Sequence, residues 1–151
     1  MNAFKKILVA VAFSKYTPTL LGYAAELAHN TKAELVVANV INIRNIEAIS
    51  SVESMGYAVN TEDYRKSLEE ERRSEIQKLL KELAISPEKV RLIFKVGHPL
   101  EKLLQIVREE DVDLVVMGLK GRTDLEHVLL GSVAEKMFRH SPVPVLSCRW
   151  K

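Results

Sequence analysis

The sequence contains a single cysteine, Cys148, and no two histidines at the spacing of metal ligands. One thiol cannot form an internal disulfide and cannot build a thiolate metal cluster. The four histidines, His29, His98, His127 and His140, are dispersed along the chain. These absences exclude a disulfide framework and argue against a metal centre made from histidine and cysteine.

An excess of charge of one sign is also lacking. Lysine and arginine number 22 and aspartate and glutamate 20, which leaves a formal net charge of +2. Basic residues such as Arg72 and Arg73 lie among acidic residues, so we interpret them as part of a solvated helix face. The balanced charge therefore gives no support for a nucleic acid or a membrane surface as partner.

Long apolar runs are missing as well. No uninterrupted apolar stretch reaches the thickness of a bilayer, and a strand-like segment follows Met1 too soon for a signal peptide. We therefore expect a cytoplasmic protein. A chain of 151 residues, 47% of them hydrophobic, is long enough to bury one ordinary core. The prediction is a single domain over residues 1–151.

Apolar runs and helical patterns alternate along the chain. The continuous apolar run 7–13 is typical of a strand buried on both faces, and Thr17-Pro18 predicts a helix N-cap with proline at the first helical position. Further strands are predicted at 34–41, 90–96, 113–117 and 143–148, and helices at 17–30, 61–83, 99–107 and 132–140. This alternation predicts an α/β fold with a parallel sheet covered by helices on both faces.

The segment 42–60 breaks this pattern. Isolated apolar residues lie between polar ones, and Gly56 interrupts any helix. We predict a long, partly mobile excursion with one short helical turn. Loops of this length in a compact domain are usually functional lids or insertions.

The two most apolar strands, 7–13 and 113–117, are expected at the centre of the sheet. Ligands of open α/β sheets bind beyond the carboxyl ends of the strands at the point where the winding direction reverses. That point falls between residues 12–14 and 117–118, which predicts a pocket there.

A glycine loop follows the second of these strands. It reads Gly118-Leu119-Lys120-Gly121, nine residues, then Gly131-Ser132 at a helix start. Glycines let backbone N–H groups approach an anion, and a helix N-terminus offers unpaired donors, so the pattern suits a phosphate. It is neither a Walker A motif nor the dinucleotide Gly-x-Gly-x-x-Gly motif. Lys120 and Arg122 either reach phosphate oxygens or stay solvated. Ser132 is expected to donate to a phosphate or to cap the helix, and the two roles are compatible.

Residues 113–146 resemble the carboxyl-terminal half of a universal stress protein. Gly118, Gly121, Gly131 and Ser132 match without a gap the Gly-x2-Gly-x9-Gly-Ser/Thr motif of that family's nucleotide-binding branch. Residues 6–14, 39–41 and 97–99 also match, so the similarity spans nearly the whole chain. The resemblance implies a three-layer sandwich of the adenine nucleotide alpha hydrolase type. Its five-stranded parallel sheet has the order 3-2-1-4-5, and the resemblance also implies a homodimer and a bound ATP.

Site residues follow from the resemblance by position. Val40 is implied to contact adenine through its backbone, and Met117 and Gly118 to border the base and ribose. The phosphates are implied to be held by Gly121, Arg122, Gly131, Ser132 and Val133, with Lys120 at a polar loop position near them.

One position departs from the family pattern: Ala12 stands where the nucleotide binders usually have an aspartate that engages the ribose. Loss of a charge-assisted hydrogen bond costs about 1.5–3 kcal/mol, so we expect weaker but not abolished binding. The substitution leaves sugar discrimination and the need for Mg²⁺ open.

The last predicted strand is an edge of the sheet. The resemblance implies that its apolar residues, Val143, Val145 and Leu146, pair with the same strand of a second copy. The alternative is a monomer whose edge is protected by Pro144.

Three functions are compatible with these residues. The first is a stress-response module that binds ATP or a related adenine nucleotide as a switch or sensor. The second is a nucleotide-independent interaction module that keeps the glycine loop as scaffold, which Ala12 favours. The third is slow ATP hydrolysis or nucleotidyl transfer through Asp124 or Glu126, although no assembled catalytic base is recognisable and solvated loop carboxylates are the simpler interpretation.

Overall fold

The computed structural model of the chain describes residues 4–119 and 131–149. Neighbouring strands are all parallel, and they lie in the order β3-β2-β1-β4-β5. The predicted strand order is therefore confirmed. The strands are β1 (Lys6–Ala10), β2 (Glu34–Asn42), β3 (Val90–Gly97), β4 (Leu114–Gly118) and β5 (Val145–Cys148).

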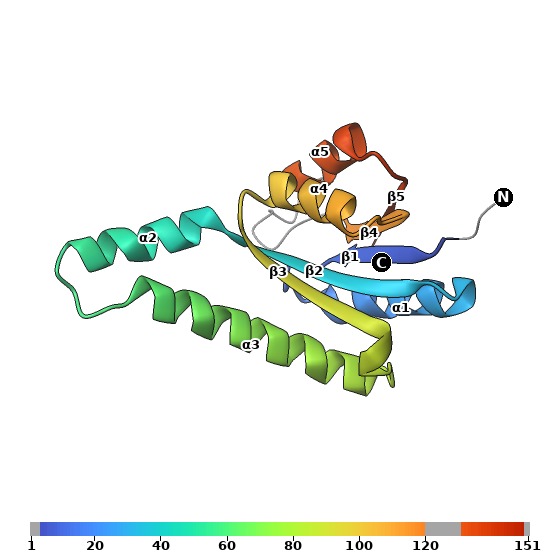
Figure 1. Cartoon of the computed structure of the whole chain (residues 1–151), viewed down its shortest axis with the longest axis horizontal. Helices are drawn as coiled ribbons and strands as arrows, with labels where there is room; N and C mark the ends of the chain where they lie inside the picture. Colours follow the sequence, from blue (N-terminus) through green and yellow to red (C-terminus); the bar gives the residue numbers. More distant parts are fainter. Residues whose placement is uncertain (1–3, 120–130, 150–151) are drawn as a thin grey trace.

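Helices cover both faces of the sheet (Figure 1). Side chains alternate between the faces along each strand: Ile7 and Val9 of β1 pack with α1 and α3, whereas Leu8 packs with α4 and α5. This is the three-layer α/β sandwich that the sequence predicts. The bounds are α1 (Thr17–Thr31), α3 (Thr61–Glu82), α4 (Pro99–Glu109) and α5 (Ser132–His140), with a 3-10 turn, η1 (Pro87–Lys89), before β3.

The segment after β2 corrects the prediction of an excursion with one short turn. Residues 43–54 form a regular helix, α2 (Ile43–Ser54), whose first turn is capped by the Asn42 side chain accepting from the N–H of Arg44 at 3.0 Å. None of its side chains is buried. With the amino-terminal half of α3 it forms an arm, residues 43–70, that projects beyond the sheet (Figure 1).

The connection from β1 to α1 differs from the predicted boundaries. β1 ends at Ala10 rather than residue 13, and Phe13 takes a left-handed conformation (φ +54°) that is incompatible with a strand. Helix α1 begins at Thr17, which is therefore not the N-cap. Ser14 closes the turn before it: its hydroxyl accepts from the N–H of Tyr16 at 3.1 Å, and its carbonyl accepts from Thr17 at 3.1 Å.

β5 begins at Val145, two residues later than predicted. Val143 instead lies in a turn, where the Ser141 hydroxyl donates to its carbonyl at 2.7 Å. β5 pairs with β4 and is one edge of the sheet. Val143 and Val145 are half-buried against α4 and α5, whereas Leu146 is exposed.

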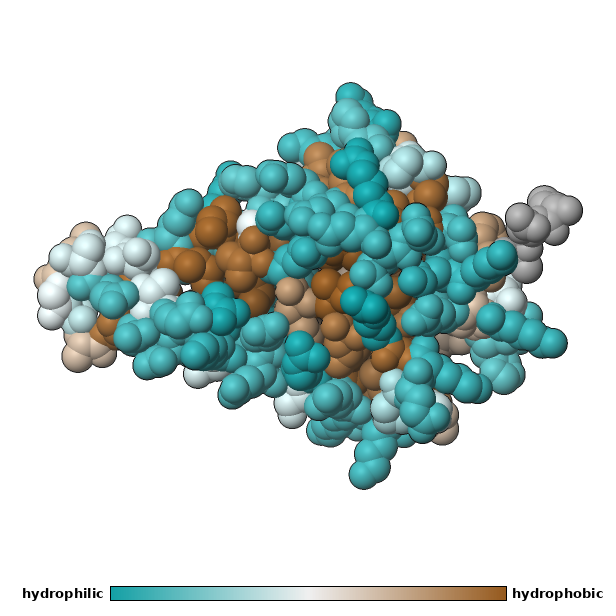
Figure 2. Space-filling model, viewed as in Figure 1, coloured by the Kyte–Doolittle hydropathy of each residue, from teal (hydrophilic) through white to brown (hydrophobic). Residues whose placement is uncertain are grey.

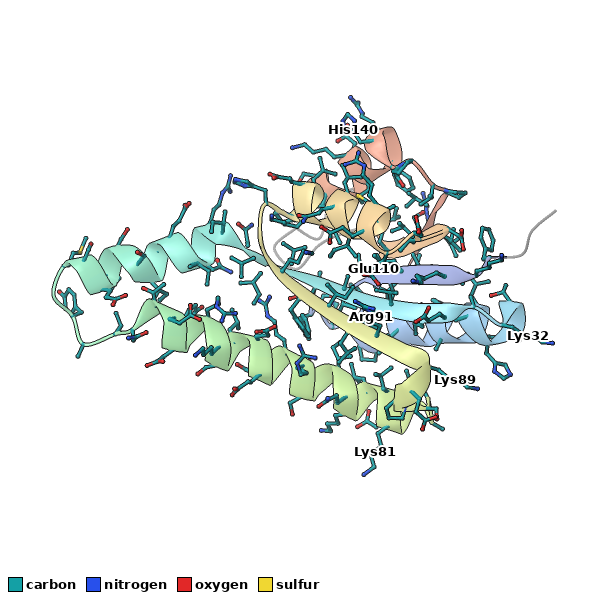
Figure 3. All side chains as sticks on the ribbon, in the orientation of Figure 1. Lys32, Lys81, Lys89, Arg91, Glu110 and His140 are labelled. Atoms are coloured by element: carbon teal, nitrogen blue, oxygen red, sulfur yellow. The ribbon has the colours of Figure 1, made fainter. Side chains whose placement is uncertain are left out.

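The opposite edge, β3, is tied to α4 by surface ion pairs. Arg91 and Glu110 meet at 3.2 Å (Figure 3), and Lys95 and Glu109 at 3.3 Å. The surface seen in this view is mostly hydrophilic, with apolar atoms showing between α3 and β3 and at the base of α2 (Figure 2). Within residues 4–119 and 131–149, no helix combines the length and apolar character needed to cross a bilayer.

Candidate functional site

A cavity of about 620 Å³ lies at the carboxyl ends of the central strands. Its wall is formed by the ends of β1, β2 and β4, the first turns of α1, α2, α4 and α5, and one face of α3. This is the predicted switch-point pocket, and its volume is in the range of small-molecule sites in proteins. Six of the predicted residues line it: Ala12, Val40, Met117, Gly118, Ser132 and Val133.

The floor of the cavity includes the last residues of β2, which extend beyond the end of the neighbouring strand β1. β1 ends at Ala10, and the N–H of Val11 donates to the carbonyl of Ala38 at 2.9 Å. Residues two apart in a strand direct their backbone groups to the same side, so Val40 faces the same way as Ala38 but beyond the end of β1. The N–H and carbonyl of Val40 are thus placed to meet the edge of a planar base.

The start of α5 forms another part of the wall. Ser132 and Val133 are its first residues, and the N–H groups of a first helical turn have no acceptor within the helix. They also lie at the positive end of the helix dipole, which favours an anion. Ser132 is exposed and is not the N-cap, so of its two predicted roles the capping role is wrong.

Gly131 departs from its predicted role. It is the N-cap of α5, and its N–H donates to the carbonyl of Leu119 at 2.6 Å. That amide is engaged in closing the loop between β4 and α5 and is not free for a phosphate in this conformation. The first intrahelical bond is donated by Glu135 to the Gly131 carbonyl, so the other first-turn donors are the N–H groups of Ser132, Val133 and Ala134.

Ala12 is half-buried at the end of β1 and presents a methyl group to the cavity. The hydroxyl nearest to it in the chain, on Ser14, is used by the N–H of Tyr16. Ser14 thus serves the turn and also lines the cavity, where its hydroxyl keeps a donor and a second lone pair but carries no charge in place of a carboxylate.

Sequence reasoning missed several polar residues of this cavity, and two of them, Asn39 and Arg72, are buried and joined by a hydrogen bond. Asn39 donates to the carbonyl of Val11 at 2.6 Å and accepts from the Arg72 guanidinium at 2.8 Å. The guanidinium also lies 5.3 Å from the ring centre of Phe13, in a cation–π contact.

The interpretation of Arg72 as part of a solvated face is therefore wrong. A signal for its burial was present in the sequence. Arg72 lies four residues after Leu68 and four before Ile76, which is the spacing of one helix face, and Ile76 is fully buried.

The charged side chains that line the cavity, among the residues that the structure describes, are all positive. They are two arginines, Arg44 and Arg72, and the described part of the lining holds no aspartate or glutamate. Together with the first turn of α5, these cations make the cavity favourable for an anionic ligand.

A second hollow, of about 470 Å³, lies between α1 and the edge strand β5. Tyr23 and Leu146, both well exposed, contribute to it together with Cys148. Burial raises the pKa of the Cys148 thiol, which keeps it protonated and unreactive near neutral pH. Cys148 is thus a buried thiol and not a nucleophile.

Several predicted residues lie outside the described part of the chain: Lys120, Gly121 and Arg122 of the glycine loop, and the carboxylates Asp124 and Glu126. For residues 4–119 and 131–149, no group of three histidine, cysteine, aspartate or glutamate side chains is placed to hold a metal ion.

The chain matches the model of the universal stress protein family over residues 3–149. Universal stress protein MJ0577 of Methanocaldococcus jannaschii is 30% identical over 156 residues, which cover 98% of this chain and 96% of that protein. YxiE of Bacillus subtilis, also a universal stress protein, is 30% identical over 151 residues, covering 97% and 99% of the two chains.

Solved structures agree with this relationship. The structure of MJ0577 superposes with a TM-score of 0.79, covering 99% of this chain and 98% of that one. A universal stress protein crystallised with cAMP superposes at 0.65 with 20% identity, covering 97% and 98% of the two chains, and shows the same fold. An Archaeoglobus fulgidus universal stress protein in complex with dAMP also shows this fold. It superposes with a TM-score of 0.64 at 16% identity, covering 99% of this chain and 100% of that one. By its sequence and its fold, the chain belongs to the universal stress protein family.

Proposed function

We propose that this universal stress protein binds an adenine nucleotide in the cavity at the carboxyl ends of β1, β2 and β4, and that it acts as a nucleotide-dependent switch or sensor. The observation that carries the proposal is the pairing of two features in one cavity. These are the uncovered backbone edge of Val40 and the first-turn amides of Ser132 and Val133.

In this arrangement the base lies against the backbone of Val40, with Met117 and Gly118 beside the base and the ribose. The phosphates lie at the start of α5, where the Ser132 hydroxyl and the amides of Ser132 and Val133 donate to them. Lys120, Gly121 and Arg122 of the glycine loop complete the phosphate site in this proposal.

Relatives support an adenine nucleotide as the ligand class. Two universal stress proteins of the same fold were crystallised with cAMP and with dAMP. We propose ATP as the cellular ligand, with Mg²⁺ as an accompanying ion. Turnover is expected to be slow at most, because no carboxylate of the described lining is placed to activate a water molecule.

A homodimer through β5 belongs to the same proposal. The strand is an edge of the sheet, and Leu146 is exposed on it, while Val143 and Val145 pack inward beside it. Pairing with a second copy would satisfy the open edge.

The direct test is acid extraction of freshly purified protein, chromatography of the supernatant, and titration of nucleotide-free protein with ATP. The informative variant is Ser132→Pro. Proline is well tolerated at the first position of a helix, and Gly131 before it is already extended (φ −69°, ψ 156°), so the fold should persist while one N–H and one hydroxyl are removed.

We expect Ser132→Pro to weaken ATP binding by about ten- to hundredfold, since each hydrogen bond to a charged group contributes about 1.5–3 kcal/mol. Ser132→Ala separates the hydroxyl from the amide and should give the smaller loss. Lys136→Ala, at an exposed position of the same helix, should leave the affinity unchanged. Unaltered binding by Ser132→Pro would refute the phosphate position.

A second function is favoured by two observations, the methyl group of Ala12 in place of a carboxylate and the engaged amide of Gly131. It is a nucleotide-independent interaction module that keeps the loop as scaffold. Absence of nucleotide in the extract, together with no saturable binding at millimolar ATP, would establish this alternative over the first.

A further inference from the structure

Arg72 gives the cavity a feature that the proposed phosphate site does not require. We infer that the cavity recognises an adenine nucleotide that carries a second anionic group, a phosphate on its ribose, and that Arg72 is the residue that selects it. This inference rests on the proposed nucleotide site and specifies its ligand.

The two anion-favouring regions of the cavity lie on opposite sides of the sheet plane. The start of α5 belongs to the face where Val133 and Ala134 pack with α4. Arg72 belongs to the other face, since Ile76, one turn further along α3, is part of the core formed with α1. A ligand that reaches both regions crosses the carboxyl ends of the strands and has anionic groups in two places.

Arg72 is held in one position by its neighbours. The Asn39 side chain uses its amide N–H on the Val11 carbonyl, at 2.6 Å, which turns its oxygen toward the guanidinium at 2.8 Å. The ring of Phe13 lies 5.3 Å away and supports the guanidinium. A fixed, planar guanidinium is suited to phosphate, because little side-chain entropy is lost when the ligand binds.

The neighbouring arginine on α3 makes its contacts on the surface and outside the cavity. Arg73 is partly exposed, lies over the ring of Phe94 at 4.9 Å, and pairs with Glu69 at 3.6 Å on the surface. It does not line the cavity. Arg73 therefore provides a matched control of the same residue type on the same helix.

Ala12 determines which part of the nucleotide meets Arg72. It lines the cavity and directly precedes Phe13, whose ring contacts the guanidinium, and the family resemblance implies that this position faces the ribose. An aspartate at residue 12 would accept hydrogen bonds from ribose hydroxyls, whereas a methyl group leaves space and no negative charge. A 2′- or 3′-phosphate is then accepted at this position and attracted by Arg72.

The test compares two isomeric probes, ADP and adenosine 3′,5′-bisphosphate, by calorimetric titration of the full chain. The bisphosphate has one more ionisable group than ADP, so Arg72→Met and Arg73→Met, which remove the same charge at two positions, separate recognition by Arg72 from a general attraction between anion and cavity. Adenosine 2′,5′-bisphosphate is the third probe and distinguishes the two ribose positions. We expect at least one bisphosphate to bind about tenfold or more tightly than ADP, and the ratio to shrink as the salt concentration rises.

Arg72→Met should abolish the preference for a bisphosphate over ADP, while Arg73→Met should keep it. Because the loss of Arg72 disturbs the buried contact with Asn39, a second variant, Ala12→Asp, leaves Arg72 in place. The new carboxylate lies beside the bisphosphate site. It should lower the affinity ratio of bisphosphate to ADP and strengthen the binding of ADP. Thermal melts of each variant report whether the fold persists.

Equal affinities for ADP and both bisphosphates would overturn the inference and leave the proposed nucleotide site standing. A preference that survives Arg72→Met in folded protein would overturn the assignment to Arg72, and one that is unchanged in Ala12→Asp would overturn the placement of the ribose phosphate beside residue 12. Failure of all three probes to bind would refute the proposed function as well.

Discussion

The two ends of the same sheet are built differently. At the amino ends, the Asp113 carboxylate accepts from the N–H groups of Lys5 and Lys6 at 2.8 and 2.9 Å, and the N–H of Asp113 donates to the Lys6 carbonyl at 2.9 Å. At the carboxyl ends, β1 and β4 stop beside a cavity of about 620 Å³. One end satisfies its polar groups within the chain, and the other presents polar groups to a ligand.

This difference separates stability from binding along the same strands. Substitutions at the closed, amino end should change the free energy of unfolding and leave nucleotide affinity alone. Substitutions at the open, carboxyl end should do the reverse, except where a polar residue of the cavity is also buried in a hydrogen-bonded network. Asn39 is that exception, and it gives the largest expected effect.

Asn39→Ala should lower the free energy of unfolding by about 2–4 kcal/mol, because it removes the donor to Val11 and leaves the buried Arg72 guanidinium without one of its acceptors. Urea denaturation measures this. Asn45→Ala, an exposed position of the same cavity lining, is the control and should be close to neutral. Equal stability of the two variants would contradict the network.

Asp113→Ala tests the closed end. Loss of the acceptor for two backbone N–H groups should lower the free energy of unfolding by about 1–3 kcal/mol. Nucleotide affinity should stay within about twofold of the parent, since the residue lies at the far end of β4. Asp113→Asn keeps an oxygen acceptor and should be milder. A large loss of affinity in a folded Asp113→Ala protein would break the separation of the two ends.

Ala84→Gly sharpens the account of the closed end. Ala84 follows α3 in a left-handed conformation (φ +55°), which is unfavourable for a residue with a Cβ atom. We expect the variant to be more stable by about 0.5–1 kcal/mol. The same change at Ala48, exposed within α2, should destabilise by a similar amount. Thermal melts of both variants give the comparison, and a destabilised Ala84→Gly would contradict it.

The arm beyond the open end should respond to acid. The N–H and hydroxyl of Thr61 both donate to the Glu53 carboxylate, which links α2 to the start of α3 and holds the pKa of Glu53 below its usual value of 4.5. Because the folded-state pKa is lowered, the link is complete above 4.5 and is lost as the pH falls through the folded-state value.

Hydrogen exchange of the amides in residues 55–60 measures this link. Exchange, corrected for its intrinsic pH dependence, should speed up on acidification in the parent protein. In Glu53→Gln the extra acceleration should vanish, and in Glu47→Gln, an exposed position of the same helix, it should remain. Identical pH profiles for all three proteins would show that the contact does not stabilise the arm.

Most of the fold could be predicted from the sequence because buried strands and core helices are marked by their apolar residues. The helix α2 could not, since none of its side chains is buried and it therefore has no apolar stripe against the core. Its cap, Asn42, was the local signal available.

The candidate site was predictable where it depends on strand ends. Ala12 and Met117 line the cavity because the strand order brings their strand ends to one edge, whereas Val40, which also lines it, was implied by the family resemblance. Arg72 was missed because its charge was given more weight than its helical spacing. The engagement of the Gly131 amide could not be foreseen, since it depends on where the Leu119 carbonyl points.

Amide chemical shifts of isotope-labelled protein, titrated with ATP, test the central claim most directly. The account predicts saturable shifts for Val40, Ser132 and Val133 at the carboxyl edge, and none for Lys6 and Asp113 at the amino edge. Shifts confined to the hollow between α1 and β5, or no shifts at millimolar ATP, would contradict it.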